Sequence, residues 1–177
     1  LPSTAESRQS EDPVRAAYVL LGPDGVAVAR VITSAPSCPR LTADGVGLEM
    51  EIRARASVEA QRSTRSALAD SKPSAFPVTT CEVHLPHAAK AVRVDGRSLP
   101  VPRSLARRIV VIGDTGCRLK ASDHAFQACN DPAAYPFARI AASAAAWRPD
   151  LVIHVGDLLY RENACPEGNS GCAGSPW

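Results

Sequence analysis

The alternation of apolar and polar residues changes near residue 105, and this change predicts two domains. From Arg15 to about Val101 the apolar runs have strand length and are broken by turn residues. The runs "AAYVLL" and "VAVARVIT" flank Gly22-Pro23-Asp24-Gly25. A glycine-rich turn between alternating apolar segments predicts a β-hairpin.

Three more runs of strand length follow, "VGLEMEIRA" at 46–54, "FPVTTCEVHL" at 76–85 and "AKAVRVDG" at 89–96. In the first of them Val46, Leu48, Met50 and Ile52 recur at every second position, so we expect one strand with one apolar face. Residues 57–75 are polar and predict a short helix or a mobile loop. The whole pattern predicts a small antiparallel β-sandwich over 15–101.

The ends of this predicted domain have a different character. Residues 1–14 are mostly polar and predict a disordered or processed amino-terminal segment. After the sandwich comes "SLPVPRSLARR", whose prolines and arginines indicate a linker, placed at 102–107 and expected to be solvated.

From Arg108 onward the pattern is that of an α/β protein. "RIVVIGD" and "DLVIHVGD" are continuous apolar runs, typical of strands covered on both faces. Between them lies an Ala-rich segment that predicts a helix ending at Arg148, before Pro149. Its apolar positions at helical spacing, including the aromatic residues expected to pack on the sheet, are Phe137, Ile140, Ala141, Ala144 and Trp147. We therefore expect a parallel βαβ unit within 108–177.

Two aspartates follow these two predicted strands. A right-handed crossover places the carboxyl ends of both strands at one edge of the sheet, so Asp114 and Asp157 converge there. Ligands of open α/β sheets bind at such an edge. Clustered carboxylates suit hard metal ions, and Tyr160 can add a phenolate. The alternative for either aspartate alone is a helix N-cap or a loop carboxylate.

Composition removes several classes of function. The chain has 177 residues, 45% of them hydrophobic, and a formal net charge of +2 with scattered arginines. This balance gives no strong attraction to nucleic acid or to an anionic membrane surface. No apolar run reaches the length of a membrane span. We expect neither nucleic acid nor membrane as a partner.

The six cysteines occur as three neighbouring couples. Six cysteines allow fifteen sets of three disulfides, and the sequence alone does not choose among them. Local spacing favours the couples Cys38 with Cys81, Cys117 with Cys129, and Cys165 with Cys172. A zinc site is disfavoured by the spacing, and buried free thiols are the remaining alternative. Disulfides would place the protein in an oxidising compartment, periplasmic or secreted.

The two aspartate motifs carry a family resemblance. "GDTG" at 113–116 and "GDLLY" at 156–160 resemble the first two blocks of the calcineurin-like metallophosphoesterases, in the GDxG and GDxxY variant of the purple acid phosphatases. Their contexts look like secreted bacterial members with a β-sandwich before the catalytic domain. The resemblance implies a β-sandwich amino-terminal domain followed by the start of an α/β metallophosphoesterase domain, its first βαβ unit.

The resemblance also implies roles for individual residues. Asp114 would bind the first metal, Asp157 would bridge both metals, and Tyr160 would be a further ligand of the first metal. Gly113, Gly116 and Gly156 would shape the turns. The implied cofactors are two divalent or mixed-valence metal ions, iron with zinc, manganese or a second iron. The implied activity is hydrolysis of phosphate esters by metal-bound hydroxide.

The chain departs from the family in lacking the later blocks, GNH, VxxH and GHxH, which carry the second metal's ligands. Two parallel strands also cannot cover a sheet or cap its edges. We therefore expect an amino-terminal portion of a larger enzyme, completed by its carboxyl-terminal part and inactive alone.

Several histidines and two other function classes complete the prediction. His84 and His87 are expected to be ordinary residues of the β-domain and a turn, and His154 a satisfied core or near-site histidine. One alternative function is a non-catalytic binding or adhesion module with a degenerate or truncated α/β segment. The other is a nucleotide-binding βαβ fold, but "GDTG" lacks the glycine spacing with which such folds bind phosphate.

Overall fold

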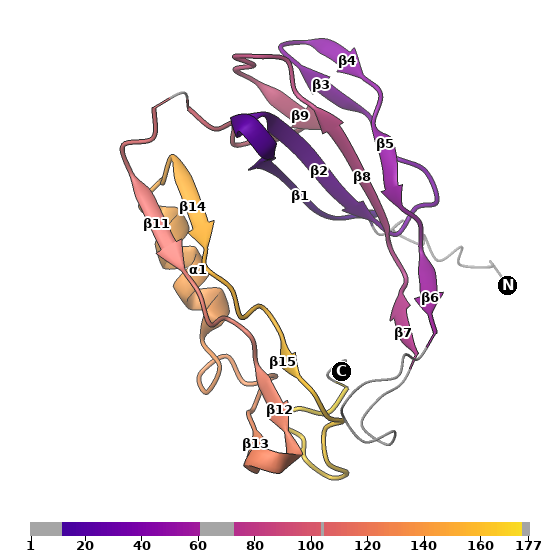
Figure 1. The fold of residues 1–177 in the computed structure, drawn as a ribbon, viewed down its shortest axis with the longest axis vertical. Coiled ribbons are helices and arrows are strands. Elements are labelled where there is room, and N and C mark those ends of the chain that lie inside the picture. The colour runs from indigo at the N-terminus through magenta and orange to yellow at the C-terminus, as the bar shows by residue number, and fades with distance from the viewer. Residues whose placement is uncertain (1–11, 61–72, 104, 175–177) are drawn as a thin grey trace, which may run out of the picture. The chain divides into compact units, whose positions relative to one another are not determined.

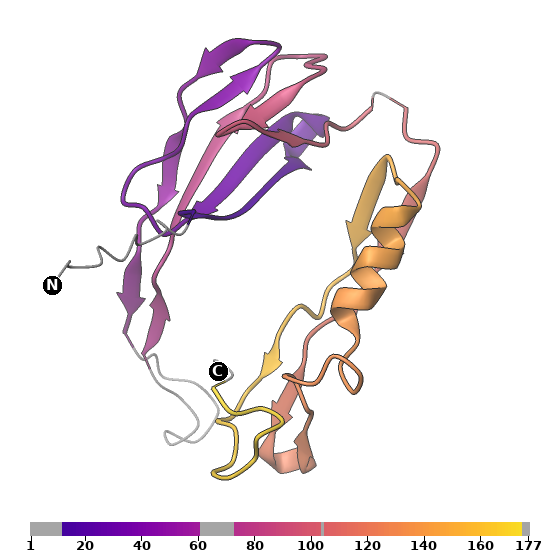
Figure 2. The same ribbon diagram turned by 180° about the vertical axis from the view of Figure 1, so that it is seen from behind.

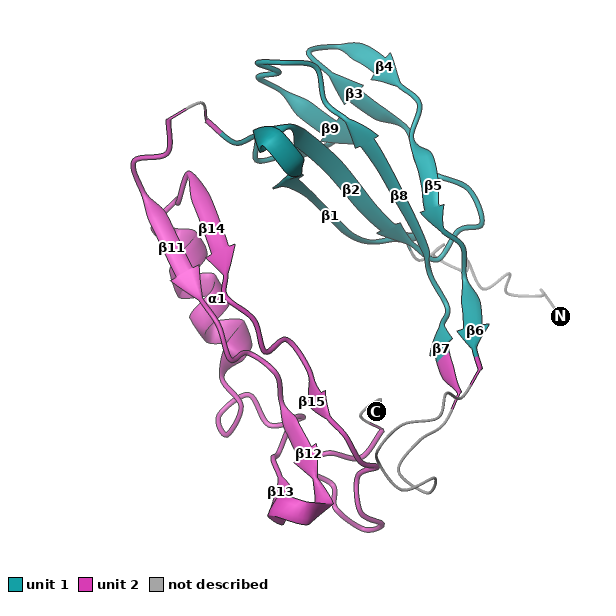
Figure 3. Ribbon diagram, viewed as in Figure 1, with its two compact units in different colours: residues 1–59, 75–102 teal, residues 60–74, 103–177 magenta. Residues whose placement is uncertain are grey.

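The computed structural model describes residues 12–60, 73–103 and 105–174. The chain divides into two compact units, 1–59 with 75–102, and 60–74 with 103–177 (Figure 3). Of the predicted amino-terminal segment 1–14, residues 1–11 lie outside the described residues. In the described remainder, the Pro13 carbonyl accepts a hydrogen bond from the Ser34 amide, and β1 begins at Val14.

Unit 1 contains two four-stranded antiparallel sheets (Figure 1). The first has the order β1 (Val14–Leu21), β2 (Ala27–Thr33), β8 (Thr79–His84) and β5 (Glu51–Ala54). The second has the order β10 (Arg97–Leu99), β9 (Val92–Val94), β3 (Leu41–Ala43) and β4 (Val46–Leu48). The prediction of a β-rich amino-terminal half is confirmed.

Tight turns set the register of the hairpins. The predicted β1–β2 hairpin is present, with the short 3₁₀ turn η1 (Pro23–Gly25) between its strands. In the β3–β4 hairpin, Asp44 has φ of 49° and Gly45 φ of 84°. In the β9–β10 hairpin the same pair recurs as Asp95 and Gly96, with φ of 45° and 82°. Asp-Gly with both φ positive suits the twist of two-residue hairpins.

The prediction of a single strand over 46–54 is wrong. The segment forms β4 in one sheet and β5 in the other, with a break at Glu49 and Met50. Leu48 and Met50 pack against the core, as the alternation indicates, whereas Val46 is 65% exposed. A strand that passes between two facing sheets keeps its apolar side inward while its backbone changes partners.

One core lies between the two sheets of unit 1. Ala29 and Val31 of β2 contribute from the first sheet, and Val92 and Val94 of β9 contribute from the second, each at most 1% exposed. Cys81 of β8 is fully buried and forms a disulfide with Cys38. The predicted couple is confirmed, and it cross-links the core.

Four short strands were not predicted from the pattern. β3 and β10 are too short to show alternation. β6 (Ser57–Glu59) and β7 (Ser74–Phe76) form a two-stranded sheet within the segment expected to be helix or loop. The remainder of that expectation, residues 61–72, lies outside the described residues.

Unit 2 begins with the expected parallel strands. β11 (Ile109–Ile112) and β14 (Leu151–His154) pair in parallel and in full register. Asp150, 4% exposed at its side chain, accepts hydrogen bonds from the amides of Arg107 and Arg108, both 3.0 Å, and pairs with Arg103. These hydrogen bonds lower the pKa of Asp150 below its usual value. The linker arginines are thus anchored to β14 as well as solvated.

The connection between β11 and β14 contains α1 (Phe137–Ala146), which lies on one face of the two strands (Figure 2). Phe137, Ala141 and Ala144 are half-buried. Trp147 and Ile140, which we expected at apolar positions against the sheet, are 75% and 53% exposed, and α1 has no buried residue. The predicted helix is present, two residues shorter than expected.

The opposite face of these strands is open within the described part of unit 2. Val111 of β11 and Ile153 of β14 are register partners and therefore point to the same side. They are 60% and 41% exposed, and Ile109 beside them is 51% exposed. A parallel sheet is normally covered on both faces. This exposed apolar face has no cover among the residues described.

A second small sheet lies beyond the ends of these strands. β12 (Arg118–Lys120) pairs in parallel with β15 (Tyr160–Arg161) and antiparallel with β13 (Ala125–Phe126). Its centre is Leu119, which is fully buried. The predicted disulfides Cys117–Cys129 and Cys165–Cys172 are both present here. All six cysteines are therefore paired as predicted.

Candidate functional site

Two backbone turns meet at the carboxyl ends of β11 and β14. The Val155 amide donates to the Ile112 carbonyl at 2.8 Å, which extends the parallel pairing by one residue. The Asp114 amide then donates to the Gly156 carbonyl at 3.1 Å, and the Gly116 amide donates to the Asp157 carbonyl at 2.9 Å. Asp114 and Asp157 thus lie in adjacent turns that bond to each other.

Both aspartates have left-handed backbone conformations. Asp114 has φ of 54° and Asp157 has φ of 61°. Among residues with a Cβ, aspartate and asparagine adopt this conformation most readily, and it still has a cost. Such backbone strain is concentrated at functional sites. The conformation turns the chain sharply at the end of each strand.

Tyr160 completes this cluster from β15. Its hydroxyl lies within reach of the carboxylates of Asp114 and Asp157, and its single proton can be donated to one of them at a time. Hydrogen bonding to Asp114, partial burial and the nearby Asp157 raise the pKa of Tyr160 well above its ordinary value. The phenol is therefore protonated at neutral pH, and binding a metal would have to release that proton. The structure brings the three predicted ligands together, while their metal binding stays a prediction.

Gly116 allows the tyrosine to approach the first turn. A Cβ at Gly116 would lie 2.8 Å from Cδ2 of Tyr160 and 3.0 Å from the backbone nitrogens of Leu159 and Tyr160. Backbone atoms cannot move aside without shifting the second turn. At Gly113 an added Cβ would meet mainly the end of the Val155 side chain, at 2.6 Å. At the third predicted turn glycine, Gly156, an added Cβ would meet no atom within 4 Å. Its φ of 115° is a backbone conformation that favours glycine.

We expect Gly116→Ala to disrupt the cluster more than Gly113→Ala. The alanine methyl would push Tyr160 away from the carboxylates, so its hydroxyl loses the bonds that raise its pKa. Spectrophotometric titration of the tyrosines at alkaline pH measures this, and Tyr160→Phe identifies the transition that belongs to residue 160. In Gly116→Ala that transition should move to lower pH. An unchanged titration in Gly116→Ala would contradict the close approach.

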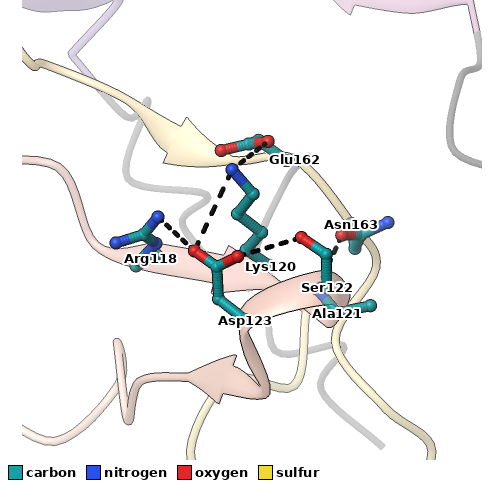
Figure 4. A network of polar contacts seen from close by, with 7 residues as sticks. All are labelled: Arg118, Lys120, Ala121, Ser122, Asp123, Glu162 and Asn163. Atoms are coloured by element: carbon teal, nitrogen blue, oxygen red, sulfur yellow. Dashed lines mark hydrogen bonds and ion pairs between the residues drawn. The ribbon is translucent and has the colours of Figure 1, made fainter. Parts of the chain in front are cut away.

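A set of paired charges lies on β12, on the 3₁₀ turn η3 (Ala121–Asp123) and just after β15 (Figure 4). The guanidinium of Arg118 lies 5.7 Å from the ring centroid of Tyr160 and pairs with Asp123. Lys120 contacts Glu162 at 3.2 Å and Asp123 at 3.9 Å. Sequence reasoning did not find this set, and its contact with Glu162 forms only when β12 and β15 pair. Arg118 thus has a carboxylate partner while its guanidinium lies near the tyrosine ring.

The donors present suit one hard metal ion. Two carboxylates and a phenol are all oxygen donors, the preferred partners of such ions. The part of the chain that the structure describes holds no group of three or more His, Cys, Asp or Glu residues placed to bind a metal. His84 lies exposed in β8 and His87 in the following turn, as expected. Ligands for a second ion are not found among the described residues.

Comparison with protein-family models, curated proteins and solved structures gives no significant match to this chain. Among the described helices, none is long and apolar enough to cross a membrane. The functional argument therefore depends on the residues and their geometry alone.

Proposed function

We propose that this chain carries the first-metal half of a bimetallic site that hydrolyses phosphate esters, as in the calcineurin-like metallophosphoesterases of the purple acid phosphatase branch. The observation that supports this is that the turns of Asp114 and Asp157 bond to each other through their backbones, with the Tyr160 phenol beside both carboxylates. Three oxygen donors from three elements meet at the sheet edge where α/β proteins bind ligands.

In this proposal the three side chains divide the work. Asp114 and Tyr160 would hold the first metal ion, and Asp157 would be a ligand of both ions. Such ions would supply polarisation of the phosphate ester and a lower pKa for the attacking water. The carboxylates beside the phenol accept its single proton and keep the tyrosine oriented. Iron with zinc, manganese or a second iron is the proposed metal content.

The proposal also includes a carboxyl-terminal part of the same protein that supplies the other ligands. The exposed apolar face at Ile109, Val111 and Ile153 supports it, because a partner layer would bury these side chains. Leu158 and Leu159, in the second turn, are each 69% exposed and would be covered in the same way. We propose a phosphate ester as the substrate and a periplasmic or secreted location, which the three disulfides fit.

We expect the 177-residue chain to show no phosphatase activity and the complete protein to show it. One set of three donors holds one ion loosely, and the attacking hydroxide needs the second ion's ligands. Hydrolysis of p-nitrophenyl phosphate, with metal analysis of both proteins, measures this. The control is the same metal concentration without protein. Turnover by the pure chain above that control would refute the requirement for further ligands, and a complete protein without metal or turnover would favour the binding-module alternative.

A further inference from the structure

We propose that His154 and Thr115 form a positioning bridge that holds the two metal-bearing turns at a set separation. Neither residue would touch metal or substrate. The inference depends on the proposed function for its consequence, which is metal affinity. The bridge itself is seen in the hydrogen bonds of His154.

The imidazole of His154 bonds to both turns. Its Nε2 lies 2.8 Å from Oγ1 of Thr115 in the first turn. Its Nδ1 accepts a hydrogen bond from the Gly156 amide in the second turn, at 3.2 Å. Because Nδ1 is an acceptor, the proton of the neutral ring lies on Nε2 and is donated to Thr115. One side chain thus bonds to a hydroxyl beside Asp114 and to an amide beside Asp157.

Thr115 is held from its other side as well. Its backbone carbonyl accepts a hydrogen bond from the hydroxyl of Tyr135, just before α1. Both groups are partly buried, which strengthens the bonds relative to exposed ones. The residue between Asp114 and Gly116 is therefore fixed by its side chain to β14 and by its backbone to the segment before α1.

The bridge lies where the two strands end and the two turns begin, so its loss would affect the separation of the turns. His154 is the last residue of β14, and its register partner Ile112 is the last residue of β11. Beyond this pair the chain leaves the sheet, and the turns are joined by only two backbone bonds, Asp114 to Gly156 and Gly116 to Asp157. The bridge adds side-chain bonds at the same place. Without it, the separation of the two carboxylates would vary more.

The test is Co²⁺ titration of the 177-residue chain, followed by visible absorption. We expect Thr115→Val, which keeps the shape and removes the hydroxyl, to weaken Co²⁺ binding by about tenfold. Thr115→Ser keeps the hydroxyl and should bind nearly as the wild type does. Urea unfolding of the same variants separates a change in metal affinity from a loss of fold. In the metal-free chain, ¹⁵N NMR should find His154 protonated at Nε2.

The possible results separate the two proposals. Absence of Co²⁺ binding by the wild-type chain overturns a first-metal site formed by Asp114, Asp157 and Tyr160 and with it the positioning role. Wild-type binding that Tyr160→Phe weakens but Thr115→Val leaves unchanged overturns the positioning role alone. A His154 ring protonated at Nδ1 overturns the bridge itself. Weaker binding in Thr115→Val, restored in Thr115→Ser, supports the bridge.

Discussion

Asp157→Asn should remove both metal ions and the phosphatase activity from the complete protein. A bridging position needs two anionic oxygens, and an amide offers one neutral oxygen and a nitrogen that is a donor only. The backbone tolerates the change, because asparagine adopts the left-handed conformation that Asp157 has, with φ of 61°. The loss would therefore come from chemistry and not from folding. Metal analysis and p-nitrophenyl phosphate hydrolysis measure it, with circular dichroism as the folding control.

Two neighbouring variants give graded controls for this result. Asp114→Asn should weaken mainly the first metal. Tyr160→Phe should keep the fold, and with Fe(III) in the site it should remove the visible band that a coordinated phenolate gives. A protein with zinc or manganese would be colourless and would refute only the iron. Full activity with unchanged metal content in Asp157→Asn would refute the metal site as a whole.

The double variant Cys38→Ala, Cys81→Ala should lose about 4 kcal/mol of unfolding free energy from unit 1, from the chain entropy of the opened loop. The disulfide spans 43 residues, and Cys81 is fully buried between the sheets. Its loss therefore relaxes the unfolded chain and removes packing from the core. Urea unfolding followed by far-ultraviolet circular dichroism measures the change.

The matched control is Cys165→Ala with Cys172→Ala, which opens a loop of only 7 residues. The same entropy relation predicts a smaller loss of about 2 kcal/mol. Equal losses in the two double variants would contradict the entropic account and indicate that packing dominates.

Local sequence signals predicted the elements whose causes are local. The β1–β2 hairpin follows from a Gly-Pro-Asp-Gly turn, and α1 ends near the predicted stop before Pro149. The parallel pairing of β11 and β14 follows from two apolar runs separated by a helix. The three disulfides follow from neighbouring cysteines. The hairpin and the helix are decided by residues within or next to them, whereas the strand pairing and the Cys38–Cys81 disulfide join segments that are merely successive in the pattern.

Features that depend on distant pairing were missed. The strand predicted over 46–54 divides between two sheets because the facing layers, and not its own alternation, select its hydrogen-bond partners. β10 gains strand structure from its pairing with β9, and β3 from lying between β9 and β4. Trp147 is exposed although helical spacing places it on the apolar side, because a side chain is buried only where another segment covers it, and α1 has no buried residue.

For the candidate site, the sequence by itself determined which donors are available and that each aspartate follows an apolar strand. The tertiary structure decided that the Tyr160 hydroxyl reaches both carboxylates, because that contact needs β15 to pair with β12. It also decided that His154 joins the turns through Thr115 and Gly156. Side-chain hydrogen bonds depend on distances of a few ångströms between separate segments, and only the folded chain sets those distances.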